Sequence, residues 1–176
     1  MKKILAFGAS NSKTSINRQL AQWAASQVVD AEPIFLHLND FEMPIYSIDR
    51  EKEQGFPQLA KDFVELINKA DGILISFAEY NGSFTSAFKN IYDWISRIEK
   101  PVWKNKPMMI LATSPGERGG VRILSHVQQL FPSTGAQLAG IFSLPSFASN
   151  FDGGITDERL LAEFQEQLEL FQQALY

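Results

Sequence analysis

The sequence predicts a doubly wound α/β fold, in which a five-stranded parallel sheet of order 2-1-3-4-5 carries helices on both faces. Two observations predict it: five short segments are continuously apolar rather than alternating, and helical patterns separate them. A third is the length of 176 residues, which suits one domain over 1–176 and is short for a barrel of about 250 residues.

The strands are expected where the chain is continuously apolar, at residues 4–7, 34–38, 72–77, 108–112 and 137–142. Helices are expected where apolar residues recur every three or four positions, at 16–28, 57–70, 83–97, 120–131 and 156–174. The stretch 39–55 is polar and contains proline, so we expect a loop there.

The composition excludes several classes of function. The chain has no cysteine, which rules out disulfides, thiolate zinc sites, iron–sulfur clusters and a cysteine nucleophile. Its 16 basic and 20 acidic residues give a net charge of −4, which argues against a nucleic-acid partner. No apolar run approaches the roughly 20 residues of a membrane span. We therefore expect a cytoplasmic protein that binds neither nucleic acid nor membrane.

Three loops of unusual composition follow the first, third and fourth predicted strands, at residues 8–17, 77–85 and 113–120. In an open parallel sheet, ligands bind beyond the carboxyl ends of the strands, at the point where the strand order reverses. This rule places the three loops around one crevice, which is the predicted binding site.

The first loop is rich in hydroxyl groups and leads into a helix, a combination that favours phosphate binding at a helix N-terminus. The candidate donors are the side chains of Ser10, Ser12, Lys13, Thr14, Ser15 and Asn17. The alternative is that Ser15 or Thr14 only caps the helix. A nucleoside-triphosphate loop is not expected, because Ser12 replaces the glycine that precedes the Lys-Thr pair of that motif.

The second loop combines an aromatic residue, Tyr80, with an Asn81-Gly82 turn. Such a loop can present backbone groups to a flat heterocycle while the tyrosine flanks it. The alternative is an ordinary turn in which Asn81 or Ser83 caps the next helix. Glu79 is a weaker candidate for a general base, since loop carboxylates are usually solvated or bonded to backbone.

The third loop contains Gly116, Gly119 and Gly120, which allow a backbone to approach a ligand closely. The alternative is a flexible connection. Arg122, one turn into the helix that follows, could serve the site or a partner subunit.

Taken in order, these residues resemble the NADPH-dependent FMN reductase family, a flavodoxin-like group that includes chromate/quinone reductases and azoreductases. The resemblance covers almost the whole chain. The first family motif, glycine-serine-x-arginine-x-x-serine-x-asparagine, is matched by Ser10, Ser15 and Asn17. The second and third motifs resemble Glu79-Tyr80-Asn81 with Lys89-Asn90 and Asp93-Trp94, and Ser114-Pro115-Gly116 with Gly119-Gly120 and Arg122.

The resemblance implies a flavodoxin-like three-layer sandwich that binds FMN. Its phosphate would be held by Ser10, Ser15, Ile16 and Asn17, and its ring and ribityl chain by Ala78, Glu79, Tyr80 and Asn81 on one side and Ser114, Pro115, Gly116, Gly119 and Gly120 on the other. Ser12 stands where the family has arginine, so Lys13 would compensate as a point charge. Ala78 and Thr85 replace family prolines, which should loosen the second loop.

The implied activity is a ping-pong NAD(P)H oxidoreductase. NADPH or NADH would reduce the FMN, and a quinone, azo compound, free flavin or similar small-molecule acceptor would reoxidise it in the same place. Arg118 is a candidate cation for the phosphate of the nicotinamide nucleotide; the alternative is a solvated loop charge. No catalytic side chain and no metal are expected; His37 and His126 have no second ligand at helical spacing. The alternative is a non-catalytic flavodoxin-type electron carrier or redox-signalling module.

The resemblance also implies a homodimer or homotetramer. Four aromatic residues are expected near the ligand edge, where association would complete the pocket: Trp94, Trp103, Phe147 and Phe151. The alternative for these side chains is ordinary core packing. Lys89 and Asp93, four residues apart, are expected to form a surface ion pair.

Overall fold

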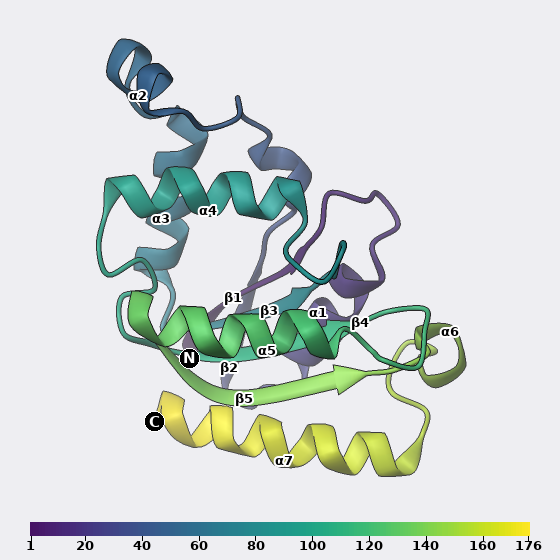
Figure 1. Ribbon diagram of the computed structural model, residues 1–176. Helices are drawn as coiled ribbons and strands as arrows, with labels where there is room; N and C mark the ends of the chain where they lie inside the picture. Colours follow the sequence, from purple (N-terminus) through teal and green to yellow (C-terminus); the bar gives the residue numbers. More distant parts are fainter.

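The structure, a computed structural model, describes all residues from 1 to 176 and confirms the predicted sheet. Five parallel strands lie in the order β2-β1-β3-β4-β5. They are β1 (Lys2–Ala9), β2 (Ala31–Phe35), β3 (Gly72–Phe77), β4 (Lys106–Thr113) and β5 (Ala136–Leu144). The strand order reverses between β1 and β3, and the carboxyl ends of all strands meet at one edge, on the right of Figure 1.

Helices cover both faces of the sheet. They are α1 (Ile16–Ser26), α2 (Ile48–Gln54), α3 (Gln58–Lys69), α4 (Ser86–Ile98), α5 (Val121–Leu130), α6 (Phe147–Asn150) and α7 (Glu158–Leu175), with short 3-10 helices η1 (Leu38–Phe41) and η2 (Phe131–Thr134). The helices α1 and α7 pack on one face, and α3, α4 and α5 on the other (Figure 1). None of them combines the length and the apolar character that crossing a bilayer requires.

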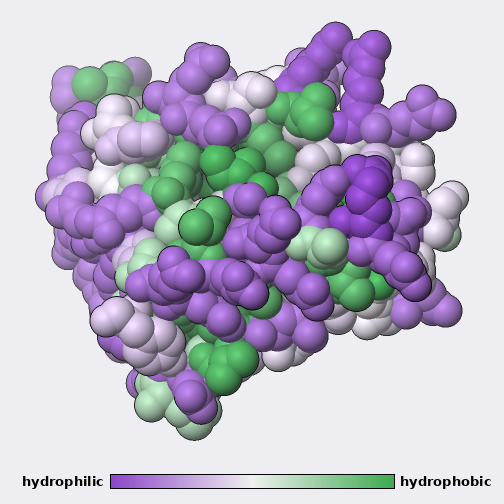
Figure 2. All heavy atoms as spheres, turned by 90° about the horizontal axis from the view of Figure 1, so that it is seen from below, coloured by the Kyte–Doolittle hydropathy of each residue, from purple (hydrophilic) through white to green (hydrophobic).

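The sheet separates two hydrophobic cores. Leu5 and Phe7 of β1 belong to the core beneath α3, α4 and α5, whereas Ile4 and Ala6 belong to the core beneath α1 and α7. Each central strand therefore buries both of its faces, which is why its sequence is continuously apolar. Hydrophilic side chains cover most of the face on which α7 lies, with hydrophobic side chains showing between them (Figure 2).

The main differences from the predicted elements follow β2. The second strand was predicted at 34–38, but β2 ends at Phe35, because the chain turns away from the sheet into η1 at Leu38. The prediction of a loop at 39–55 is also wrong, because α2 lies within it. That helix buries no residue and therefore has no apolar pattern; its signals are Ser47, which caps Arg50 N, and Gly55, at φ 73°.

Three of the four predicted association residues, Trp94, Trp103 and Phe147, lie in the hydrophobic cores, and Phe151 packs against the core that contains Phe147. The side chains of Trp94 and Trp103 are fully buried. The Trp94 indole donates to Pro44 O at 2.8 Å, and Trp103 stacks on Phe131 with ring centroids 4.9 Å apart. Trp94 lies on the apolar side of the amphipathic α4, which faces the core, and Trp103 is buried in the segment between α4 and β4. Core packing is therefore the correct interpretation for these two residues.

Candidate functional site

The three predicted loops meet at the carboxyl edge of the sheet around a groove of about 280 Å³. It is lined by Ser10, Ser12, Thr14, Ser15, Ile16, Asn17, Ala78, Glu79, Tyr80, Thr113, Ser114 and Pro115. Of the predicted site residues, Lys13, Asn81, Gly116, Gly119 and Gly120 do not line it. Thr113 lies in the predicted third loop but was not singled out as a binding residue; it is the last residue of β4 and lines the groove.

The N-terminus of α1 opens into the groove. Ser15 is the N-cap, and its Oγ accepts from Arg18 N at 3.1 Å, so it does cap the helix as the alternative interpretation held. The backbone N–H groups of Ile16 and Asn17 have no partner within the chain. Two free donors and the positive end of the helix dipole therefore face a groove lined with hydroxyl groups, an arrangement suited to an anion.

The Asn17 side chain has a structural role that the sequence did not indicate. Its side chain is buried, donates from Nδ2 to Thr113 O at 3.0 Å, and accepts from Thr113 N and Ser76 Oγ at 3.0 and 2.8 Å. The amide thus ties α1 to β3 and β4, and a contact between Asn17 and a phosphate stays a prediction. Gly8 permits that close approach: a Cβ there would lie 2.4 Å from Arg18 N.

The Arg18 guanidinium contacts the first loop without lining the groove. Arg18, in the first turn of α1, donates from Nη2 to Lys13 O, and its Nη1 lies 3.3 Å from His37 Nδ1. Since a guanidinium can only donate, His37 Nδ1 is the acceptor in this contact. The Lys13 side chain is exposed and lies off the groove. The role of Lys13 as a compensating charge stays a prediction, and Arg18 is a further cation beside the loop that the sequence analysis did not single out.

The second loop is a tight hairpin. Tyr80 N donates to Ser83 O at 3.0 Å and Ser83 N to Tyr80 O at 3.1 Å, with Asn81 and Gly82 between them at φ 55° and 76°. Positive φ at both central residues is the mark of a type I′ turn, which Asn-Gly strongly favours. The turn places Tyr80, half-exposed, on the wall of the groove.

Thr85 fastens this loop to the first one. Its Oγ1 accepts from Phe88 N, which makes Thr85 the cap of α4 in place of the predicted Asn81 or Ser83. The same hydroxyl donates to Ala9 O at 2.9 Å, and the side chain is buried. The expectation that threonine in place of proline loosens the loop is therefore wrong.

Glu79 joins the second loop to α5. Its Oε2 accepts from Ile123 N at 3.1 Å, in the first turn of that helix. The N-cap of α5 is Gly120, at φ 79°, which has no side chain for this purpose. The Glu79 carboxylate is bonded to a backbone N–H, as loop carboxylates usually are, and this capping role explains the residue without a part in general-base chemistry.

The third loop is well supported, in contrast to the alternative of a flexible connection. Ser114 O and Gly116 O accept from Phe147 N at 3.1 Å and Ser146 N at 2.9 Å, at the start of α6. Gly119 is required where the loop passes the end of β5: at φ 55°, a Cβ would lie 2.4 Å from Ser143 Oγ. The third loop is thus supported by β5 and by α6. The sequence pattern predicted a strand at β5 but no helix at α6.

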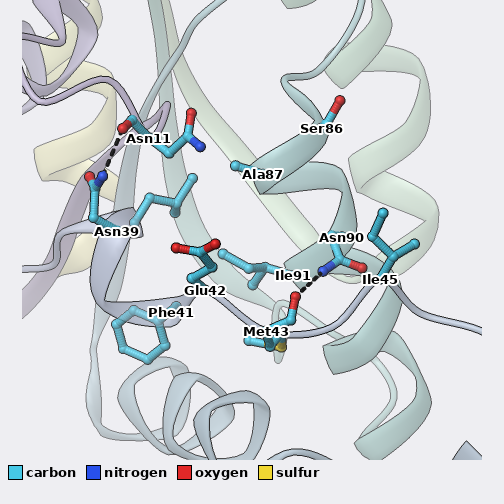
Figure 3. A pocket seen from close by; sticks show the side chains of 11 residues that line it. Asn11, Asn39, Phe41, Glu42, Met43, Ile45, Ser86, Ala87, Asn90 and Ile91 are labelled. Carbon is cyan, nitrogen blue, oxygen red and sulfur yellow. Dashed lines mark hydrogen bonds between the residues drawn. The ribbon is translucent and has the colours of Figure 1, made fainter. Parts of the chain in front are cut away.

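A second hollow, of about 300 Å³, lies beside the first loop, between η1 and α4 (Figure 3). Asn39 Nδ2 donates to Asn11 O at 2.7 Å and braces the first loop from this side. Asn90, a residue of the second family motif, donates to Met43 O at 3.1 Å and accepts from Tyr46 N at 2.8 Å. Its amide therefore anchors the segment that follows η1.

Two further predicted features take structural roles. Lys89 and Asp93 form the expected ion pair on the exposed side of α4, at 2.7 Å. His126 packs against Phe84, with ring centroids 5.2 Å apart. No group of three or more His, Asp or Glu side chains is arranged to hold a metal ion.

Comparison with known proteins identifies the family. The model of the NADPH-dependent FMN reductase family matches residues 2–149. The chain is 30% identical over 175 residues to an NAD(P)H-dependent FMN reductase of Pseudomonas aeruginosa, covering 97% of this chain and 93% of that protein. It is 36% identical over 127 residues to a 2-hydroxy-1,4-benzoquinone reductase of Burkholderia, covering 72% and 68%.

Other matches are partial or more distant. A quinone reductase of Escherichia coli is 37% identical over 89 residues, and the matched region spans about half of each protein, 51% of this chain and 47% of the relative. Among solved structures, a flavoenzyme NAD(P)H:(acceptor) oxidoreductase from Paracoccus denitrificans superposes with a TM-score of 0.79 at 24% identity, covering 99% and 97% of the two chains, which supports the fold. Matched over most of its length, the chain belongs to the NADPH-dependent FMN reductase family.

Proposed function

We propose that residues 1–176 form a single FMN-binding domain that acts as an NAD(P)H oxidoreductase toward quinones, azo compounds, free flavin or similar small acceptors. The observation that carries the proposal is the groove: its anion-binding end lies at α1, and two loop walls continue from that end. Family membership supports FMN as the bound cofactor and NADPH or NADH as the electron donor.

The α1 end of the groove fits a flavin phosphate. Free backbone N–H groups of Ile16 and Asn17 would donate to it, with hydroxyl groups of Ser10, Ser12, Thr14 and Ser15 nearby. The loop between β1 and α1 contains no carboxylate that would repel the phosphate. Arg18 adds positive charge behind the loop. Backbone donors with a helix dipole are a common way to bind phosphate.

The two walls fit a flat ring. Ala78 and Tyr80 lie on one wall and Ser114 and Pro115 on the other. When bound, FMN supplies reversible two-electron chemistry, accepting hydride from a reduced nicotinamide and passing electrons to an acceptor. The chain's own part is to bind and orient: Tyr80 offers an aromatic face at the rim, and the backbone of both walls offers hydrogen-bonding groups.

No side chain of the groove is required as an acid, base or nucleophile for this function. The Glu79 carboxylate is engaged with Ile123 N. Arg118 is exposed on the third loop, and we propose it as the cation that attracts the phosphate of a pyridine nucleotide. The donor and the acceptor would use the same open side of the groove in turn, which gives a ping-pong cycle.

We further propose that the protein is a cytoplasmic homodimer or homotetramer. Support for association comes from the segment after η1, where Ile45 and Ile48 are 78% and 51% exposed and Ile45 borders the second hollow. Apolar side chains exposed together favour a contact surface. Sedimentation at micromolar concentration tests the association; a monomer would count against it.

The absorption spectrum of the purified protein tests the main proposal. We expect visible flavin bands that change on FMN binding, bleach anaerobically with NADPH or NADH, and return when a quinone is added. Absence of any FMN binding would remove every flavin function. Binding without bleaching by either nucleotide would favour the non-catalytic electron carrier.

A further inference from the structure

A carboxylate ties one wall of the groove to α5, the helix that continues from the other wall. Glu79 and Tyr80 belong to the second loop, and the Glu79 carboxylate reaches across to Ile123 N in the first turn of α5. The third loop runs directly into that turn through Gly119 and Gly120. A capping acceptor normally comes from the residue before the helix, but Gly120 cannot supply one, so it comes from a position 44 residues away in sequence.

A second contact places the hairpin of the second loop against the same turn. A Cβ built at Gly82 would lie 3.9 Å from Arg122 Cδ, so the Arg122 stem passes beside the hairpin. The second loop therefore meets α5 at both its wall residue and its tip. The Ser114–Pro115 wall is held independently by α6, as Phe147 N donates to Ser114 O.

We propose that Glu79 is a positioning residue that holds the two walls of the flavin slot at a fixed spacing and keeps other anions away from α5. This inference rests on the proposed function. The carboxylate compensates the positive end of the α5 dipole, where a ligand phosphate would otherwise be attracted. The α1 end of the groove, capped by the neutral Ser15 hydroxyl, is then the one open to the FMN phosphate.

The test compares Glu79→Ala and Glu79→Gln with Glu117→Gln, an exposed carboxylate on the third loop as the matched control. Dissociation constants of FMN and of riboflavin are measured by fluorescence quenching. In Glu79→Ala we expect both to rise by about tenfold and equally, because one hydrogen bond of a charged group is lost while the α1 site is unchanged. Glu79→Gln should stay within about twofold of wild type, since its amide oxygen still accepts.

Inorganic phosphate tests the second half of the proposal. In wild type it should weaken FMN binding and leave riboflavin binding unchanged; in Glu79→Gln it should weaken both, because α5 becomes accessible to anions. Two results would overturn the proposal: riboflavin binding by Glu79→Ala that equals wild type, or riboflavin binding by Glu79→Gln that is indifferent to phosphate. Failure of the wild-type protein to bind either flavin would refute the proposed function instead.

Discussion

The N-termini of α1 and α5 occupy similar places in the fold but are capped by different groups. Each helix follows a loop at the carboxyl end of a central strand, and in each the third backbone N–H is capped. In α1 the acceptor is the neutral hydroxyl of the adjacent Ser15. In α5 it is the carboxylate of Glu79, from another loop.

The difference in charge separates two tasks. A neutral cap satisfies one N–H and leaves the helix dipole uncompensated, so α1 retains its attraction for an anion. A carboxylate cap satisfies the N–H and compensates the dipole, so α5 serves to hold the walls together. Arg18 adds to the contrast by placing a cation behind α1. On the proposed function, the α1 end of the groove would bind the phosphate, and the α5 end would fix the position of the walls.

The largest effect is expected from Asn17→Ala, which removes the anchor of α1. Three hydrogen bonds would be lost, leaving Thr113 N and O and Ser76 Oγ buried without partners. We expect the free energy of unfolding to fall by about 3 kcal/mol and FMN affinity to fall with it, measured by urea unfolding and fluorescence titration.

Gln19→Ala, an exposed change on the same helix, is the control and should alter neither quantity. Wild-type FMN affinity in Asn17→Ala would show that the position of α1 does not control the anion end of the groove.

Ser15→Ala tests the neutral cap. We expect a loss of about 1 kcal/mol in stability and about tenfold weaker FMN binding, with riboflavin binding unchanged, because the hydroxyl lies at the phosphate end. Ser47→Ala removes an equivalent cap from α2, where Ser47 Oγ accepts from Arg50 N at 3.1 Å. Equal flavin affinities in the two variants would contradict the assignment of the phosphate to α1.

A smaller effect on FMN affinity is expected from Arg18→Gln. Arg18→Gln removes the positive charge behind the loop, and we expect roughly threefold weaker FMN binding with a shallower salt dependence, while riboflavin binding is unaffected. Arg159→Gln, which removes an exposed charge of similar kind on α7, is the control. Unchanged salt dependence in Arg18→Gln would show that the helix dipole and backbone donors act alone.

The sequence could predict the sheet and the loops that form the groove, because continuous apolar strands and glycine- and serine-rich loops are local patterns. It could not predict partnerships between distant residues. An asparagine that donates to phosphate and one that anchors a helix in the core have the same composition around them, and only the fold places Asn17 beside Thr113. The pairing of Glu79 with Ile123 is likewise invisible until the second loop meets α5.

The sequence pattern also failed to predict α2, for a related reason. The helix α2 packs no residue into the core, so its sequence has no apolar period to detect. It is held by polar contacts: Glu51 accepts from Arg97 Nε at 3.0 Å and from Tyr46 OH at 2.9 Å. The Arg97 contact joins α2 to α4 through residues 46 positions apart.

The smallest effect on stability is expected from Glu51. Its carboxylate forms an ion pair with Arg97, whereas the Glu79 carboxylate caps a helix. The hydrogen bonds from Arg97 and then Tyr46 lower the pKa of Glu51 below its ordinary value. A lowered folded-state pKa contributes stability above the unfolded-state pKa, and this contribution is lost as the pH falls through the folded-state value. The Tm of Glu51→Gln should thus lie slightly below that of wild type near neutral pH and converge with it in acid.

Glu53→Gln, an exposed change on the same helix, is the control, and its Tm should match that of wild type at every pH. Neither variant should alter FMN binding, since α2 contributes no residue to the groove. A difference that persists in acid would mean that Glu51 acts through packing rather than charge, unlike Glu79.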